Sequence, residues 1–213
     1  MKNLIYRVAI AAFVVAVIVG CSSNDVKISG RFVGLNSKMV YLEQMSATGQ
    51  SLVDSVALSN DGSYLFTIKE VAPTPSLYNV IYGGDRIPLL VSRGENIELN
   101  AMGSALANYT VSGSYESELL RKFNKSYIEN QLALNKIILG YHKATPEKRK
   151  ELSESYNTIY RTIKRNQITF IIENKGYIAS VYALYQRLPG EQYLSSMESD
   201  KVYYSTVADA VNE

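Results

Sequence analysis

The sequence predicts an α+β protein in which an N-terminal antiparallel β-sandwich or open barrel precedes a C-terminal helical hairpin or bundle. Two patterns favour this fold class. Apolar and polar residues alternate from residue 26 to about residue 113, and apolar residues then recur every three or four positions. The composition is that of a folded globular chain, with 46% hydrophobic and 20% charged residues among 213. A single cysteine and a single histidine exclude an internal disulfide and disfavour His- or Cys-based catalysis.

The first 21 residues have the layout of a bacterial lipoprotein signal. Two basic residues precede the twelve apolar residues Val8 to Val19, a run shorter than the ~20 residues that span a bilayer. The segment Ile18 to Cys21 resembles a lipobox, whose cysteine receives a diacylglycerol before cleavage and acylation of the new amine. We therefore expect a signal peptide at residues 1–20, then a lipidated Cys21 and tether at residues 21–25. A plain signal peptide or a membrane anchor is the alternative.

Removal of the signal peptide changes the net charge. It deletes two basic residues and no acid, so that 22 Lys and Arg fall to 20 and equal the 20 Asp and Glu. A neutral mature chain gives no general reason to expect nucleic acid or an anionic membrane surface as a partner. We expect lipid on Cys21 to place the protein in the cell envelope at the outer membrane, facing either the periplasm or the cell surface. Each buried methylene adds ~0.8 kcal/mol to such an anchor.

A β-rich domain is expected at residues 26–113. Candidate strands lie at 26–33, 38–43, 52–58, 63–68, 77–82, 86–91, 96–99 and 109–111. Between the third and fourth strands, Asp61-Gly62 predicts a tight hairpin, because glycine readily supplies the positive φ that such turns require. Pro88 predicts that its strand lies at a sheet edge or begins there, because proline has no N–H to donate.

A helical domain is expected at residues 114–213. Two long helices carry an apolar a/d seam that Asn130 and Asn166 interrupt, and Thr145 is a suitable N-cap for the second of them. The seam fits an intramolecular hairpin or a dimer. Shorter helices follow at residues 178–188 and 200–211. The apolar and aromatic seam residues are Leu120, Phe123, Tyr127, Leu134, Ile137, Tyr141, Leu152, Tyr156, Ile159, Ile163 and Phe170.

The sequence assigns no catalytic, cofactor-binding or metal-ligating residue. His142 has no ligand partners at suitable spacing and is interpreted as a favourable charge at a helix C-terminus. The run Glu147 to Glu151 is interpreted as a solvated helix face. Twelve of the 17 tyrosines follow residue 102, and we expect them to pack between helices, with a ligand groove as the alternative. Six of these tyrosines are Tyr156, Tyr160, Tyr182, Tyr185, Tyr203 and Tyr204.

Four segments carry a resemblance to a known family: Ile28–Phe32, Val40–Leu42, Asp54–Val56 and Asp61–Phe66. They resemble a domain of unknown function found at the N-terminus of lipid-anchored, thioredoxin-like thiol–disulfide oxidoreductases of Gram-negative envelopes. The likeness covers roughly residues 26–110, and the later helices look like the linker before the thioredoxin domain. That enzymatic domain uses a Cys-x-x-Cys pair, whereas this sequence has one cysteine and no tryptophan. None of the family's catalytic residues therefore has a counterpart here.

We expect a non-catalytic lipoprotein of the cell envelope that binds or scaffolds a protein partner, without a cofactor and without nucleic acid. Two alternatives remain open. The chain is the anchoring N-terminal half of a thioredoxin-like oxidoreductase whose catalytic domain lies outside this sequence, or it is a lipoprotein that captures a peptide or a glycan.

Overall fold

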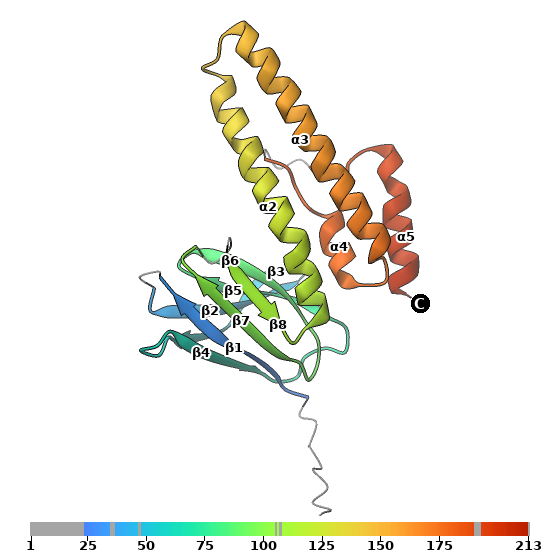
Figure 1. Ribbon diagram of the computed structural model, residues 1–213. Coiled ribbons are helices and arrows are strands. Elements are labelled where there is room, and N and C mark those ends of the chain that lie inside the picture. Colours follow the sequence, from blue (N-terminus) through green and yellow to red (C-terminus); the bar gives the residue numbers. More distant parts are fainter. Residues whose placement is uncertain are drawn as a thin grey trace, which may run out of the picture.

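The computed structural model describes residues 24–34, 37–46, 48–104, 106, 108–189 and 193–212. Within these residues, eight strands precede four α-helices, as the sequence predicts (Figure 1). The strands are β1 (Val26–Val33), β2 (Met39–Ser46), β3 (Gly49–Ala57), β4 (Ser63–Ile68), β5 (Ser76–Tyr82), β6 (Asp85–Val91), β7 (Asn96–Met102) and β8 (Tyr109–Ser112). The helices are α2 (Tyr115–Tyr141), α3 (Pro146–Glu173), α4 (Ile178–Leu184) and α5 (Lys201–Val211), with a 3-10 turn at Glu198–Asp200.

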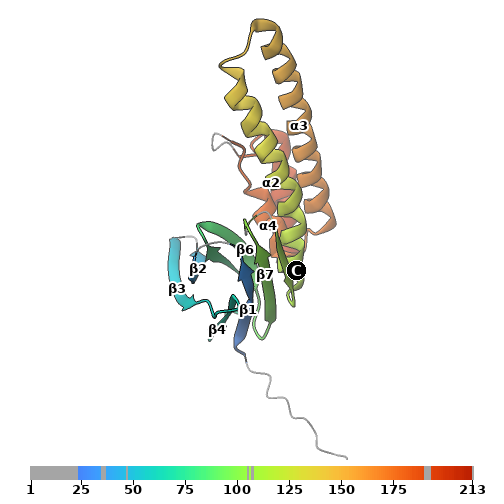
Figure 2. The ribbon, with the colours of Figure 1, turned by 60° about the vertical axis from the view of Figure 1, so that its left-hand side comes forward.

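The strands form two four-stranded sheets that pack face to face as a β-sandwich (Figure 2). One sheet has the order β4-β1-β7-β8 and the other has the order β3-β2-β5-β6. Every pairing is antiparallel except β1 with β7, which is parallel. The predicted sandwich is therefore confirmed, and the parallel pair is a feature that the strand pattern did not indicate.

Aromatic rings join the two sheets across the core. Phe32 of β1 stacks on Tyr64 of β4 and on Tyr82 of β5, with ring centroids 4.6 and 4.7 Å apart. Aromatic contacts of this kind contribute ~0.5–1.5 kcal/mol each beyond the burial of their area. The buried Tyr64 hydroxyl donates to the Leu99 carbonyl at 2.8 Å, so the ring fills the core without leaving its polar atom unpaired.

The prediction that Asp61-Gly62 joins two paired strands as a β-hairpin is wrong, although a turn is present at these residues. Gly62 has φ +85°, as a tight turn requires, but β3 and β4 belong to different sheets and do not pair. The turn is bound instead to β1. One Asp61 oxygen accepts from the Ser63 N–H at 3.1 Å and the other forms an ion pair with Arg31 at 2.7 Å, while the Gly62 carbonyl accepts from the Phe32 N–H at 2.9 Å.

The predicted helical hairpin is confirmed. Helices α2 and α3 lie side by side and run antiparallel (Figures 1 and 2). Thr145 caps α3 by accepting from the Lys148 N–H at 3.4 Å. Helix α4 ends at Leu184, earlier than predicted, because the chain then turns back and pairs Arg187 with Tyr193 in an isolated β-bridge. Among the described helices, none has the length and apolar character that a membrane crossing needs.

The start of α2 is joined to the edge of β6 through Leu90. The Ser117 hydroxyl accepts from the Leu90 N–H at 3.1 Å and donates to the Leu90 carbonyl at 2.8 Å. Ser114, the N-cap of α2, donates to the same carbonyl at 3.0 Å. Pro88 lies in this strand, which confirms the predicted edge position, and its missing N–H faces the same edge two residues away.

The Leu90 side chain continues this junction on the apolar side. It is 1% exposed and packs with Leu119, Leu120 and Ala179, so that β6, α2 and α4 share one small core. Gly113, between β8 and α2, has φ +83°, and a Cβ atom there would lie 2.0 Å from the Asn96 carbonyl oxygen. The chain can therefore turn from the sheet into α2 at this point only with glycine.

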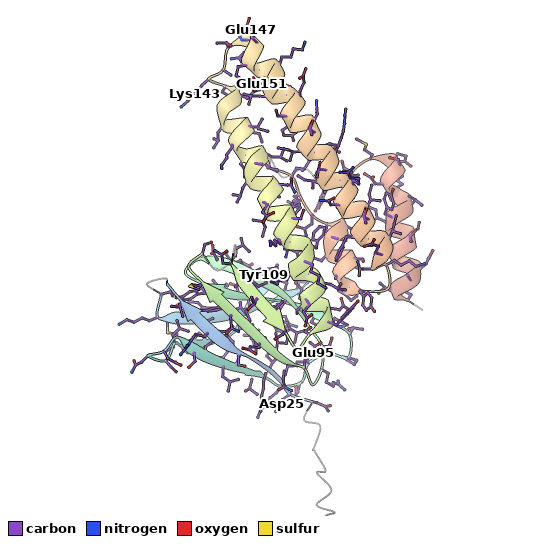
Figure 3. All side chains as sticks on the ribbon, viewed as in Figure 1. Asp25, Glu95, Tyr109, Lys143, Glu147 and Glu151 are labelled. Atoms are coloured by element: carbon purple, nitrogen blue, oxygen red, sulfur yellow. The ribbon has the colours of Figure 1, made fainter. Side chains whose placement is uncertain are left out.

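Two half-buried carboxyl groups lie at the same junction, and burial raises the pKa of both. The Glu95 carboxylate accepts from the Ser92 N–H at 2.8 Å and interacts with the Ser114 side chain, and both contacts partly offset the increase in its pKa, while the charge of Glu116 adds to it. Burial likewise raises the pKa of Glu116, against the opposing effect of the Ala179 N–H at 2.8 Å. Figure 3 shows Glu95 close to the start of α2.

Replacing the hydroxyl that holds Leu90 should destabilise the protein. Ser117→Ala leaves the Leu90 N–H without the partner described above, and we expect the free energy of unfolding in urea to fall by ~1–3 kcal/mol. Ser155→Ala removes a hydroxyl that donates to the Glu151 carbonyl on the outer part of α3, and it should change stability by less than ~0.5 kcal/mol. Equal losses of unfolding free energy in the two variants would contradict the prediction that the contact of Ser117 with Leu90 stabilises the protein.

The raised carboxyl pKa values predict a pH dependence with a definite sign. A group whose pKa is higher in the folded state stabilises the fold below its unfolded pKa and loses that contribution as the pH rises through the folded value. The double variant Glu95→Gln/Glu116→Gln should therefore flatten the decline of unfolding free energy between about pH 4.5 and neutrality.

Asp61 provides a control, because its pKa is lowered in the folded protein rather than raised. The Ser63 hydroxyl, followed by Arg31, lowers the pKa of Asp61 to about 2. Asp61→Asn should therefore lower the unfolding free energy by a constant amount above about pH 4.5, leaving the slope there unchanged, and this loss should shrink as the pH falls below about 4. The prediction for Glu95 and Glu116 would be contradicted if the unfolding free energies of wild type and the double glutamine variant ran parallel from pH 4.5 to neutrality.

Candidate functional site

A groove lies between α2 and α3 in the described part of the chain. Its volume is about 520 Å³, within the range usual for ligand sites. We call it the hairpin groove. It is lined from α2 by Leu119, Lys122, Phe123, Ser126, Tyr127 and Asn130, and from α3 and its C-cap by Ile163, Arg165, Asn166, Thr169, Phe170, Glu173 and Asn174.

Aromatic rings form the floor of the hairpin groove. Phe123 stacks on Tyr127 with ring centroids 5.7 Å apart, and Phe170 lies 4.9 Å from Phe123 on the facing helix. These rings occupy seam positions at i, i+4 on α2 and opposite them on α3, which is why they meet between the helices. Burial raises the pKa of Tyr127 to about 12, so its hydroxyl stays neutral, and it donates to the Arg187 carbonyl.

Polar side chains lie in the groove around Ser126. The Asn130 amide donates to the Ser126 carbonyl at 2.7 Å, and the Asn166 amide of α3 donates to the Ser126 hydroxyl at 3.2 Å. The two asparagines are the residues that interrupt the predicted seam. An amide carries both donors and an acceptor, so these positions place hydrogen-bonding groups directly beside the aromatic floor.

Charged residues of both signs line the groove. Lys122 and Arg165 are basic and Glu173 is acidic. The combination of an apolar aromatic floor, side-chain amides and rim charges of both signs, two basic and one acidic, suits a polar chain with an apolar side group. It supplies no cluster of like charges for a phosphate or a metal ion, and the described residues contain no group of three or more His, Cys, Asp or Glu that could hold a metal.

The opposite face of α3 is covered by the C-terminal segment, which a buried ion pair holds in place. The Lys164 ammonium lies 2.7 Å from an Asp200 carboxylate oxygen, and these side chains are 15% and 4% exposed. Lys164 also donates to the Leu194 carbonyl at 2.9 Å, and Gln167 donates to the Ala183 carbonyl at 2.7 Å. This network positions α4 and α5 and leaves the hairpin groove uncovered.

Sequence-derived candidates fall at the places predicted, but not in the hairpin groove. His142 is the C-cap residue of α2, and Glu147 to Glu151 are all exposed. Five of the six named tyrosines are half-buried between helices, which confirms packing as their main role, whereas Tyr185 is 56% exposed. Cys21 lies outside the described residues. The sequence analysis identified neither Ser126 nor Thr169 as part of a site.

Comparison with known families gives one match. Residues 26–120 match the family DUF4369, a domain of unknown function. No curated protein matches the chain. The match covers less than half of the 213 residues and includes the whole sandwich together with the first turns of α2. Its end at Leu120 takes in the junction that holds Leu90, so the start of α2 falls within the matched region. A DUF4369 domain is thus found at residues 26–120, which confirms the resemblance to a domain of unknown function; its association with thioredoxin-like oxidoreductases stays a prediction.

Proposed function

We propose that the chain is a non-catalytic, lipid-anchored module of the bacterial cell envelope that binds a peptide segment of an envelope partner in the hairpin groove. The lipobox-like segment ending at Cys21 supports the anchor. The groove supports the binding role, and its make-up of rings and amides is the single observation that carries the proposal.

The dimensions of the groove favour a short extended peptide. Its α2 wall runs from Leu119 to Asn130, which at 1.5 Å per residue is a length of ~16 Å. An extended chain covers that length with about five residues. Main-chain amides of such a peptide can pair with Asn130, Asn166 and Thr169, while an apolar side chain rests on Phe123 and Phe170.

The lining also argues for binding without catalysis. It contains hydroxyl side chains, but no His or Cys and only one carboxylate, Glu173. A hydroxyl nucleophile needs an adjacent base, and acid–base hydrolysis commonly uses paired carboxylates. Neither arrangement is present in the groove.

A second candidate function follows from the resemblance and the matched domain. The chain is the anchoring half of a thioredoxin-like thiol–disulfide oxidoreductase, with α2 to α5 as the linker to the catalytic domain. Sequencing the gene beyond the codon for residue 213 tests this candidate. A Trp-Cys-x-x-Cys segment there supports it, and an immediate stop codon contradicts it.

The anchor is tested by lipid labelling in a Gram-negative host. Wild type grown with radiolabelled palmitate should incorporate label and partition with membranes. Cys21→Ala should incorporate none, because the thiol that accepts the diacylglycerol is lost. Equal labelling of the two proteins, or a bare thiol on the purified mature chain found by mass spectrometry, contradicts the anchor.

Filling the hairpin groove should abolish peptide binding. Thr169→Trp places a bulky ring in the groove from its exposed rim, so binding to an array of pentapeptides should fall at least tenfold. Thr158→Trp is the matched control, because Thr158 is exposed on the same helix and does not line the groove. A flat response of wild type on the array contradicts the proposal, as does full retention of binding by Thr169→Trp. Binding to a glycan array instead indicates a glycan-capturing protein.

A further inference from the structure

We propose that the peptide bound in the hairpin groove carries a carboxylate, which Arg165 holds about two residues away from the apolar side chain that rests on Phe123 and Phe170. This inference rests on the proposed function and names the class of peptide that the groove selects. The carboxylate belongs either to an acidic side chain or to the free C-terminus of the partner, and the test has a separate probe for each source.

Arg165 is the basic side chain that lines the groove from α3. It is exposed, and the five ion pairs found among the described residues join other side chains. A guanidinium presents its N–H donors in a planar fork that matches the two oxygens of a carboxylate. Arg165 can therefore bind a peptide carboxylate without breaking an ion pair within the described part of the chain.

The charges along the groove place a carboxylate at Arg165 rather than at the end nearest the sandwich. Glu173 lies at that end, in the last turn of α3, where the final carbonyls of the helix add partial negative charge and no basic residue offsets them. Arg165 comes eight residues earlier, a separation of ~12 Å along the helix. Lys122 lies between these two levels, next to Phe123. A peptide anion is thus repelled from the end that holds Glu173 and attracted toward Arg165.

The parts of the two helices that contain the groove are also basic as a whole. Residues 119–130 and 161–174 together carry six Lys and Arg against two Asp and Glu, a formal charge of +4. Lys164 pairs with Asp200 on the opposite face of α3, and counting that acid leaves a local charge of +3. Residues 21–213 carry equal numbers of both signs, so a peptide anion meets a more favourable field here than over the chain as a whole.

The positions of Arg165 and the aromatic floor determine the spacing of the two groups on the peptide. Phe170 follows Arg165 by five residues, a distance of ~7.5 Å along α3, and Phe123 contacts Phe170 from α2. An extended chain advances ~3.3 Å per residue, so that a carboxylate and an apolar side chain two residues apart fit these positions. Side chains two residues apart on an extended chain also point to the same side, so both can face the groove.

The test uses pentapeptides that carry a fluorescent label on the N-terminus, one phenylalanine, and serine at the remaining positions. The first peptide has glutamate two residues from the phenylalanine and an amidated C-terminus, and its matched controls have glutamine or lysine in place of glutamate. This series is made in both chain directions, and the tighter-binding direction is used. The second peptide carries its carboxylate as a free C-terminus two residues after the phenylalanine, and its control is the same peptide amidated.

Binding of each peptide to the purified full chain is measured by fluorescence anisotropy at low salt. We expect a carboxylate peptide to bind at least about threefold more tightly than its neutral control, and the lysine peptide to bind more weakly than the glutamine peptide. A tenfold increase in salt should reduce this advantage, because exposed charges are screened. An advantage confined to the glutamate peptide assigns an acidic side chain, and one confined to the free acid assigns a chain terminus.

Three variants test the role of Arg165. Arg165→Gln should reduce the advantage of the carboxylate peptide over its neutral control to less than about 1.5-fold, because the guanidinium is lost. Arg165→Glu should reverse the preference, so that the lysine peptide binds more tightly than the glutamate peptide, which loss of a merely structural side chain would not produce. Arg161→Gln is the matched control, since Arg161 is an exposed arginine of the same helix that does not line the groove, and it should keep most of the advantage. Circular dichroism and thermal midpoints confirm that the variants fold.

The results that overturn this inference differ from those that overturn the proposed function. Carboxylate, neutral and lysine peptides that bind equally well overturn the selection of a carboxylate, while peptide binding in the groove stands. An advantage of the carboxylate peptide that survives in Arg165→Gln overturns the role of Arg165 in the same way. Absence of binding by every peptide, the neutral ones included, overturns both.

Discussion

The attachment of α2 to the edge of β6 determines how the two halves of the protein are arranged. An edge strand presents unpaired N–H and C=O groups that invite association with other chains. Here the hydroxyls of Ser114 and Ser117 pair with both backbone groups of Leu90, while its side chain enters the small core shared with α2 and α4. The same contact sets the direction in which the hairpin leaves the sandwich. The position of the hairpin groove relative to the sandwich follows from it.

Local sequence patterns predicted strands such as β4 well because burial alternates along them. In β4 the residues at alternate positions are buried and the others face solvent, as the pattern indicates. What local patterns could not indicate was which strands pair. The turn at Asp61-Gly62 has the chemistry of a hairpin, yet contacts with Arg31 and Phe32 join it to a strand of the other sheet. The parallel pairing of β1 with β7 likewise depends on long-range contacts, which no local sequence pattern indicates.

The candidate site was predictable only in outline. The a/d seam predicted both long helices, and Asn130 and Asn166 were visible as polar residues in apolar positions. The contact of Asn130 with Ser126 lies within α2, whereas the contact of Asn166 with Ser126 depends on the register of α2 against α3, which the sequence leaves open. The face that stays uncovered depends on long-range contacts such as Lys164 with Asp200. The excess of tyrosine indicated packing in the helical half, and one of these tyrosines, Tyr127, lies in the floor of the groove beside Phe123.

Whole-chain charge is a poor guide to partners when charge is segregated along an elongated fold. The balance of 20 basic and 20 acidic residues after Gly20 gives no reason to expect electrostatic attraction to a charged partner. Screening at physiological salt limits each charge to a range of ~8 Å, however, so a partner at the end of a ~40 Å helix senses only nearby residues. The chain already shows the consequence, since its acidic C-terminal segment lies on its basic hairpin through a buried ion pair.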